Sequence, residues 1–290
     1  MHPFSRLLLA TEHSEHDAGS ERVALAMAQR CGLPLAAVLP ILSNPEYEAV
    51  APELAARTEA AAAARVARLA AVAAEQGVTL EVKARRGPLL FREIVDEAAE
   101  RAAELVIIRR RGKLGLLANL LVGEMVGQVL AHAPCSVLVT PRESTMWRRH
   151  VLIGLDPAAP DAAALEQGAA IAAQCDLPLT LLAVADSAGS AVADAALSSA
   201  QTRCRSVLAA GGASADALAR VQVRRVGGKP HKALIETAGQ CGADLIVVGR
   251  HGDRSIQRAW VGGVTQKVIG LAGCPVLVAI GHHPSTEKPA

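Results

Sequence analysis

The stretch ADLIVVGRHGDRSIQRAWVGGVTQKVIGLAGCPVLVA, residues 243–279, decides the fold. It opens with a short apolar run bounded by turn residues, Leu245–Val248, which is typical of a buried parallel strand. A loop follows that contains Gly249, Gly252 and Gly262. Apolar residues then recur at i, i+4 and i+7, which predicts a helix that begins near Gly263: Val264, Val268 and Leu271.

The order of strand, glycine loop and helix start has a chemical meaning. Glycine lets the backbone approach a ligand closely, and a helix start presents unpaired N–H groups and the positive end of the helix dipole. Together they predict a cradle for phosphate. A tight surface turn is the alternative for an isolated Gly-x2-Gly, and the flanking strand and helix favour the cradle here.

The spacing Gly249-x2-Gly252-x9-Gly262 resembles the ATP-binding pattern of the universal stress protein family, Gly-x2-Gly-x9-Gly-(Ser/Thr). The preceding Ala-Asp-Leu-Ile-Val-Val and the closing Cys-Pro-Val-Leu-Val are also similar to that family. Gly263 stands at the Ser/Thr position, and Thr265 stands where members often carry a second hydroxyl. Loss of one hydroxyl is expected to weaken binding by about 1 kcal/mol, the value of one ordinary hydrogen bond, because the backbone donors remain.

The second half of the chain repeats the first. The segment 30–35, RCGLPL, recurs at 174–179 as QCDLPL, and CSVLV at 135–139 recurs at 274–278 as CPVLV. The boundary is predicted in the polar stretch 141–149, which divides the chain into domains 1–144 and 145–290, with a polar tail from about 281. This stretch is too short for a free tether, so the two halves are expected to pack together.

Alternating strands and helices with short connections predict an α/β fold, a parallel sheet with helices on both faces. The resemblance implies two tandem Rossmann-like (adenine nucleotide alpha hydrolase-like) domains, each a five-stranded sheet of order 3-2-1-4-5. The last strands, Ser136–Thr140 and Pro275–Ile280, are candidates for exposed edges. Family members pair there, which implies an internal pseudo-dimer of the two halves; a homodimer of such chains stays open.

A ligand of such a sheet lies where the strand order reverses, so Asp156 and Gly249 are expected to face one crevice. A turn or helix-cap role is the alternative for Asp156. The resemblance implies that the nucleotide contacts residues near the base and ribose, then residues of the phosphate loop: Gly154, Leu155, Asp156, Val184, Val248, Gly249, His251, Gly252, Gly262, Gly263, Val264 and Thr265.

The first half departs from the family pattern. Arg109 stands at the first glycine position, Glu124 at the Ser/Thr position, and ten residues rather than nine separate Gly112 from Gly123. A carboxylate at the helix start would repel phosphate and occupy the anion site itself. We therefore predict that the first half does not bind ATP in the family manner. We also hypothesise that Glu124 pairs with a neighbouring cation: Arg109, Arg110, Arg111 or Lys113.

Composition excludes several classes of function. Aromatic residues make up 2% of the chain and the net charge is +2, which argues against binding to nucleic acid or to anionic membranes. No run approaches a membrane helix, and the start of the chain does not resemble a signal peptide, so a cytoplasmic protein is expected. The cysteines lack C-x-x-C spacing and the pair His13-x2-His16 has no evident third ligand, so no metal site is expected.

The sequence also lacks a nucleophile–base pair, paired catalytic carboxylates and a P-loop lysine, so an enzyme is not expected, although weak ATP hydrolysis stays open. The prediction is a stress-response protein that binds ATP, or ADP or AMP, with or without magnesium, in its C-terminal domain. It would act as a regulatory or protective binding module with protein partners that the sequence does not name. The alternatives are a slow nucleotide phosphohydrolase and a nucleotide-free interaction scaffold.

Overall fold

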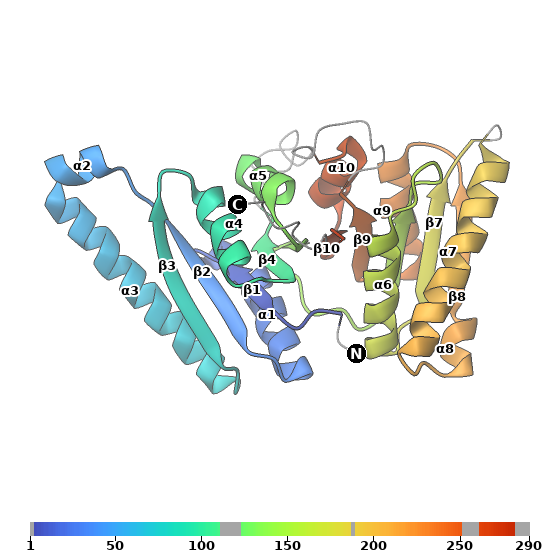
Figure 1. Ribbon diagram of the computed structural model, residues 1–290, viewed down its shortest axis with the longest axis horizontal. Helices are drawn as coiled ribbons and strands as arrows, with labels where there is room; N and C mark the ends of the chain where they lie inside the picture. Colours follow the sequence, from blue (N-terminus) through green and yellow to red (C-terminus); the bar gives the residue numbers. More distant parts are fainter. Residues whose placement is uncertain (1–2, 111–122, 187–188, 251–260, 282–290) are drawn as a thin grey trace, which may run out of the picture.

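The computed structural model describes residues 3–110, 123–186, 189–250 and 261–281. Two α/β halves lie side by side along one continuous sheet (Figure 1). Among the described residues, the elements of the first half are β1 (Leu7–Ala10), a 3-10 turn (Glu15–Asp17), α1 (Ala18–Cys31), β2 (Leu35–Leu42), α2 (Pro45–Val50), α3 (Pro52–Glu75), β3 (Leu80–Gly87), α4 (Leu90–Glu100), β4 (Leu105–Arg109), α5 (Glu124–His132) and β5 (Ser136–Thr140).

The second half has the same order of strands. Its described elements are β6 (Val151–Leu155), α6 (Ala162–Cys175), β7 (Leu179–Val184), α7 (Ser190–Ala210), α8 (Ala215–Ala219), β8 (Val221–Val226), α9 (Pro230–Cys241), β9 (Leu245–Gly249), α10 (Gly263–Leu271) and β10 (Val276–Ala279). Within the described ranges, no helix is both long and apolar enough to cross a bilayer.

The strand order is β3-β2-β1-β4-β5-β10-β9-β6-β7-β8. Each half therefore has the predicted order 3-2-1-4-5, and all pairs within a half are parallel. The two halves meet where β5 pairs with β10 antiparallel, in the register Val139 with Val276 and Val137 with Val278. The predicted internal pseudo-dimer is thus built by joining two exposed edges into a ten-stranded sheet.

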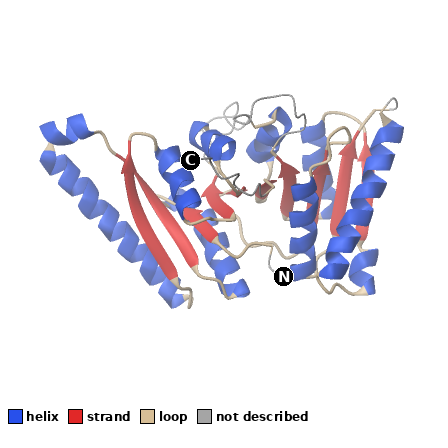
Figure 2. Ribbon diagram, viewed as in Figure 1, coloured by secondary structure: helices blue, strands red, loops and turns tan. Residues whose placement is uncertain are grey.

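Helices cover both faces of this sheet (Figure 2). Side chains alternate along each strand: Leu7 and Leu9 of β1 point to the face of the sheet that α1, α3, α6 and α7 cover, whereas Leu8 and Ala10 point to the face that α4, α5, α9 and α10 cover. Because both faces are buried, the central strands are mostly apolar, which explains the nearly continuous apolar runs in the sequence.

The outer strands of the first half differ from the expectation. The apolar run at the start of β2 ends at Leu39, before Pro40, but the ladder of β2 with β3 continues to the pair Leu42 and Gly87. Charged residues in β3 interrupt the apolar run, so the sequence pattern underestimates its length. The short helices α2 and α8 were not expected either, because six and five residues are too few to show a helical period.

The segment between the halves packs against the core. Met146 and Trp147 are buried in the same cluster as α1 and α6. Asp244, just before β9, accepts hydrogen bonds from the backbone N–H groups of Arg148, Arg149 and His150. This contact fixes the entry into β6 beside β9, the two strands at which a ligand site is expected.

Candidate functional site

A cavity of about 530 Å³ lies at the carboxyl ends of β6, β7 and β9, where the strand order of the second half reverses. This volume lies in the usual range for small-molecule sites. The starts of α9 and α10 and the segment leading into α6 surround the cavity. Residues predicted from the sequence line it: Gly154, Leu155, Asp156, Val184, Val248, Gly249, Gly262, Gly263, Val264 and Thr265. The remaining two predicted residues, His251 and Gly252, lie outside the described residues.

The inner wall of the cavity is apolar. Leu182, Leu234 and Val248 line it. Gly154 permits α9 to pack closely on β6, because a Cβ at this position would lie 2.9 Å from Leu234 Cδ2 and 3.2 Å from Val248 Cγ1. A smooth apolar wall of this kind suits the face of an aromatic ring.

Asp161 also lines the cavity and was not among the predicted residues. Its Oδ1 accepts a hydrogen bond of 3.0 Å from the N–H of Ala164 and so caps the start of α6. Its Oδ2 lies against Gly249, because a Cβ on that glycine would come within 2.5 Å of this oxygen. An aspartate directly before a helix was the available signal for this residue.

The start of α10 forms the opposite end of the cavity. The Gly262 N–H donates to the carbonyl of Arg250 at 2.9 Å, which joins the residue after β9 to the residue before α10. The Thr265 hydroxyl donates to the Gly249 carbonyl at 2.9 Å, so its proton ties α10 to the end of β9 instead of pointing at a ligand. The N–H groups of the first helical turn have no acceptor within the helix and provide donors for an anion.

Cationic side chains gather beside the starts of α9 and α10. Desolvation, and then the charges of Lys267, Lys232 and Lys229, lower the pKa of His231 in the first turn of α9. Three lysines that disfavour a protonated imidazole create a positive local field, which attracts an anion. Across the cavity, Asp156 Oδ1 accepts the Ala158 N–H at 3.0 Å, which is a turn contact.

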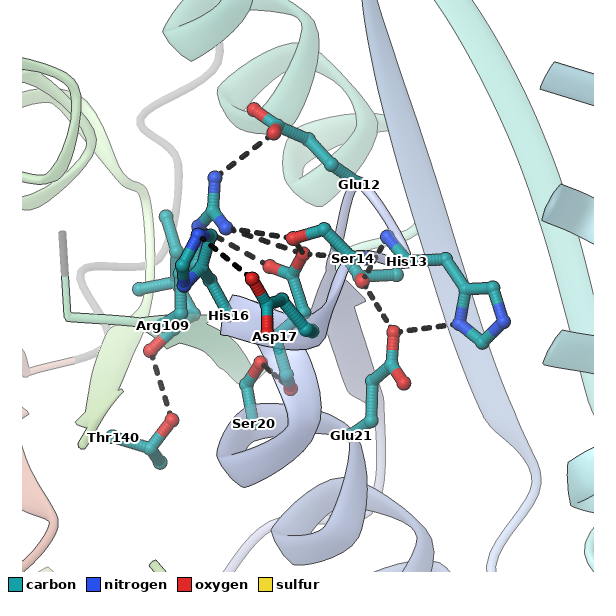
Figure 3. A network of polar contacts seen from close by, with 12 residues as sticks. Glu12, His13, Ser14, His16, Asp17, Ser20, Glu21, Arg109 and Thr140 are labelled. Atoms are coloured by element: carbon teal, nitrogen blue, oxygen red, sulfur yellow. Dashed lines mark hydrogen bonds and ion pairs between the residues drawn. The ribbon is translucent and has the colours of Figure 1, made fainter. Parts of the chain in front are cut away.

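The equivalent crevice of the first half is filled by Arg109, whose side chain is 6% exposed (Figure 3). Its Nη2 lies 2.9 Å from Glu12 Oε2, its Nη1 donates to Ser14 Oγ at 2.9 Å, and its Nε lies 3.3 Å from Asp17 Oδ1. In the repeat, Glu12 and Asp17 stand at the positions of Asp156 and Asp161. The carboxylates that line a cavity in the second half therefore bind a guanidinium in the first.

The hypothesis that Glu124 pairs with Arg109 or Arg110 is wrong. Arg109 binds Glu12 and Asp17, and Arg110 donates to backbone carbonyls of the second half, whereas Glu124 is exposed at the start of α5. The arginine reaches inward because it ends β4 directly beside two carboxylates that follow β1. The other two candidates, Arg111 and Lys113, lie outside the described residues.

The remaining candidates have other partners. Over the described ranges, no group of three or more His, Cys, Asp or Glu side chains is arranged to hold a metal ion. His13 Nδ1 lies 3.0 Å from Glu21 Oε1. Burial raises the pKa of both Cys135 and Cys274 to about 12, so these thiols stay protonated and act as packing residues.

Comparisons with known proteins agree with this architecture. The profile of the universal stress protein family matches residues 3–141 and again residues 148–279. A universal stress protein of Methanocaldococcus jannaschii is 38% identical over 51 residues, which span 18% of this chain and 32% of that relative.

Solved structures show the same fold over the full length. A universal stress protein of Archaeoglobus fulgidus superposes with a TM-score of 0.72 at 19% identity, covering 96% of this chain and 97% of that one. A Pseudomonas aeruginosa protein of unknown function gives a TM-score of 0.63 at 17% identity, with coverage of 95% and 92%. With the family profile matching both of its five-stranded halves, this chain belongs to the universal stress protein family and carries two tandem copies of the family domain.

Proposed function

We propose that the second half binds an adenine nucleotide, ATP or its di- or monophosphate, and acts as a regulatory or protective binding module in a stress response. The phosphates would lie at the start of α10, the ribose beside Asp156, and the base against the apolar wall near Val184. One observation carries this proposal: residues predicted from a nucleotide-binding pattern meet around one cavity that ends at a helix N-terminus.

The charge distribution supports the same orientation of the ligand. The lysines near His231 lie beside the starts of α9 and α10, where the phosphates are proposed, and Asp156 lies on the β6 side, where ribose hydroxyls need an acceptor. Adenine nucleotides combine an apolar ring, hydroxyls and an anion. The cavity offers a matching surface for each of these parts.

We propose binding rather than fast turnover. Asp156 and Asp161, the carboxylates that line the cavity in the described part of the chain, each accept a backbone N–H and so shape the turn and the helix start. They are also the oxygen ligands that would suit a magnesium ion arriving with the phosphates. Slow hydrolysis remains the second candidate, and a steady release of phosphate from ATP by the purified protein would favour it.

The first half is proposed to bind no nucleotide. The guanidinium of Arg109 occupies its crevice, and the exposed Glu124 stands at the helix start where a phosphate would lie. We therefore expect one nucleotide per chain, and we expect its occupancy to change contacts with protein partners.

The test uses substitutions at Gly263, where an added side chain meets open space and should not disturb the fold. Calorimetric titration with ATP, ADP and AMP, with and without magnesium, measures affinity and stoichiometry. Gly263→Glu copies the residue of the first half and should weaken ATP binding by about tenfold through like-charge repulsion, while its helix-start carboxylate preserves stability. Gly263→Ser restores the family hydroxyl and should strengthen binding by about 1 kcal/mol.

Gly263→Gln is the matched control, because it has the size of glutamate without the charge. Equal loss in the Glu and Gln variants would mean that bulk rather than charge matters. Absence of binding by the wild-type chain at saturating nucleotide would reject the proposal and favour an interaction scaffold. Two nucleotides per chain would contradict the assignment of the first half.

A further inference from the structure

Two arginines cross the junction between the halves, which we call the seam, defined by the pairing of β5 with β10. Arg110 follows β4 and Arg250 follows β9, at equivalent positions of the repeat. Arg110 Nη1 donates to the carbonyl of Ala272 at 2.6 Å and lies 3.3 Å from those of Ile269 and Gly270. Arg250 Nη1 lies 3.5 and 3.4 Å from the carbonyls of Leu130 and Ala131.

Each arginine therefore contacts the last turn of a helix in the opposite half. The carbonyls near Arg110 belong to the C-terminal end of α10, and those near Arg250 to the C-terminal end of α5. A cation at a helix C-terminus binds carbonyls that lack partners and complements the negative end of the dipole.

The helix α10 has a second role at its other end. Its first residues, Gly263 to Gln266, line the cavity, and the bond from Gly262 N–H to the Arg250 carbonyl ties its start to the end of β9. The first half thus holds α10 from its C-terminus, while the N-terminus of the same helix points at the proposed phosphates.

The Arg110 side chain binds these carbonyls in a partly buried position, not on the open surface. The side chain is partly buried, and burial lowers its pKa, so placing the guanidinium here has a cost that the carbonyls of α10 offset. A cation at the C-terminus of α10 and an anion at its N-terminus would act on one dipole and one short helix, which gives a physical basis for coupling the two ends.

We infer that Arg110, a residue of the half that has lost its own site, is a positioning residue for the nucleotide site of the other half. It fixes the position and tilt of α10 relative to the sheet, and thereby the position of the N–H groups that bind the phosphates. This inference rests on the proposed function. It gives the first half a physical task in ligand binding although its crevice is filled.

The experiment measures binding of ATP, AMP and adenosine to the full chain and to Arg110→Gln and Arg110→Lys. Coupling between sites typically changes affinity by about 5- to 150-fold, and we expect the low end, about fivefold weaker binding of ATP and AMP by Arg110→Gln. Adenosine lacks phosphate, so its affinity should be unchanged. Lysine also binds helix-end carbonyls, so Arg110→Lys should recover part of the loss.

Arg22→Gln is the matched control. Arg22 also lies in the first half and donates to backbone carbonyls, those of Arg142 and Ser144 in the segment between the halves, without contact to α10. Circular dichroism and thermal unfolding of each variant confirm the fold at the titration temperature. Wild-type affinity for all three ligands is expected in this control.

Three results would overturn the inference in distinguishable ways. If Arg110→Gln and Arg110→Lys both bind ATP as the wild type does, Arg110 does not position α10, and the proposed function stands. If adenosine and ATP weaken equally, Arg110 supports the fold in general and not the phosphate end. If the wild type binds none of the ligands, the proposed function itself fails.

Discussion

Position 109 of the first half and position 249 of the second are equivalent in the repeat. The residue at this position determines whether the crevice beside it is open or filled. Glycine at 249 leaves room for Asp161 beside a cavity, since even a Cβ would lie 2.5 Å from its Oδ2. Arginine at 109 extends into the corresponding space and binds Glu12 and Asp17. A single side chain thus fills the space that a ligand would need and pairs with the two carboxylates that border it.

Arg109→Gly should destabilise the protein without creating a second nucleotide site. Asp17 is 1% exposed, and removal of its cation should cost about 3 kcal/mol, the low end for a broken buried pair, because Ser14 N–H and O–H still donate to it. Urea unfolding measures the loss, and Arg142→Gly, which breaks an exposed pair with Glu15, should cost less than about 1 kcal/mol. A stoichiometry of two nucleotides per variant chain would contradict this reading.

His231 should make nucleotide binding depend on pH. Its pKa is lowered by desolvation and by the neighbouring lysines, and a bound phosphate opposes those charges and raises it again. The complex therefore takes up a proton, and affinity should strengthen as the pH falls from about 7.5 to about 5.5. Without ligand the sign reverses: the unfolded chain binds the proton more readily, so stability falls as the pH drops through about 6.5.

Titrations of the wild type and of His231→Gln with nucleotide across this pH range isolate the contribution of the imidazole to the pH dependence of affinity. Protonation of the phosphate itself affects both proteins equally. The difference between the two affinity profiles should vanish at high pH and grow at low pH. Identical profiles would place the phosphates away from the start of α9.

At the scale of elements, β3 and α4 form a charged outer layer of the first half. Glu97 of α4 is 1% exposed and meets three cations: Arg85 Nη1 at 2.8 Å, Lys83 Nζ at 3.0 Å and Arg101 Nε at 2.5 Å. Burial alone would raise the pKa of Glu97, but hydrogen bonds from Arg85, Arg101 and Lys83 outweigh it and lower the pKa. This layer lets a strand rich in charge form the edge of the sheet and discourages pairing with other chains.

Glu97→Ala should lower the free energy of unfolding by about 3 kcal/mol, because it leaves three cations around a buried gap. Glu100→Ala removes a half-exposed carboxylate of the same cluster and should destabilise the protein much less. Chemical denaturation at neutral pH compares the two variants. Since the pKa values of Glu97 and Glu100 are lowered, the latter to about 2, this stability should be lost as the pH falls below about 4.5.

At the scale of the molecule, the seam turns two five-stranded sheets into one. Leu138 and Leu277 face each other across it, and both are 1% exposed. Ser136 adds polar contacts, because its hydroxyl donates to Gln167 Oε1 at 2.8 Å and accepts the Ile280 N–H at 3.0 Å. The two arginines at the helix ends add reciprocal contacts between the halves.

The isolated second half, residues 145–290, should therefore form a homodimer. Without β5, the edge of β10 presents unpaired backbone groups and an apolar surface that a second copy can cover antiparallel. Light scattering coupled to gel filtration measures the mass. The full chain is the control, since its β10 edge is already paired, and a monomeric isolated half would show that β10 does not suffice for pairing.

The sequence alone determined the order of elements, the duplication and the position of the glycine loop. Apolar period, turn residues and repeat spacing are local properties, so they are readable without coordinates. The family resemblance added the strand order and the set of cavity residues from Gly154 to Thr265. Short polar helices such as α2 left no comparable signal.

Only the tertiary structure decided which side chains meet. Arg109 finds Asp17 at a separation of 92 residues, and Arg110 finds the Ala272 carbonyl at a separation of 162 residues. The groups that a long side chain reaches depend on the distances between the elements that carry them. Those distances exist only once the strands are ordered and the two halves are joined at the seam.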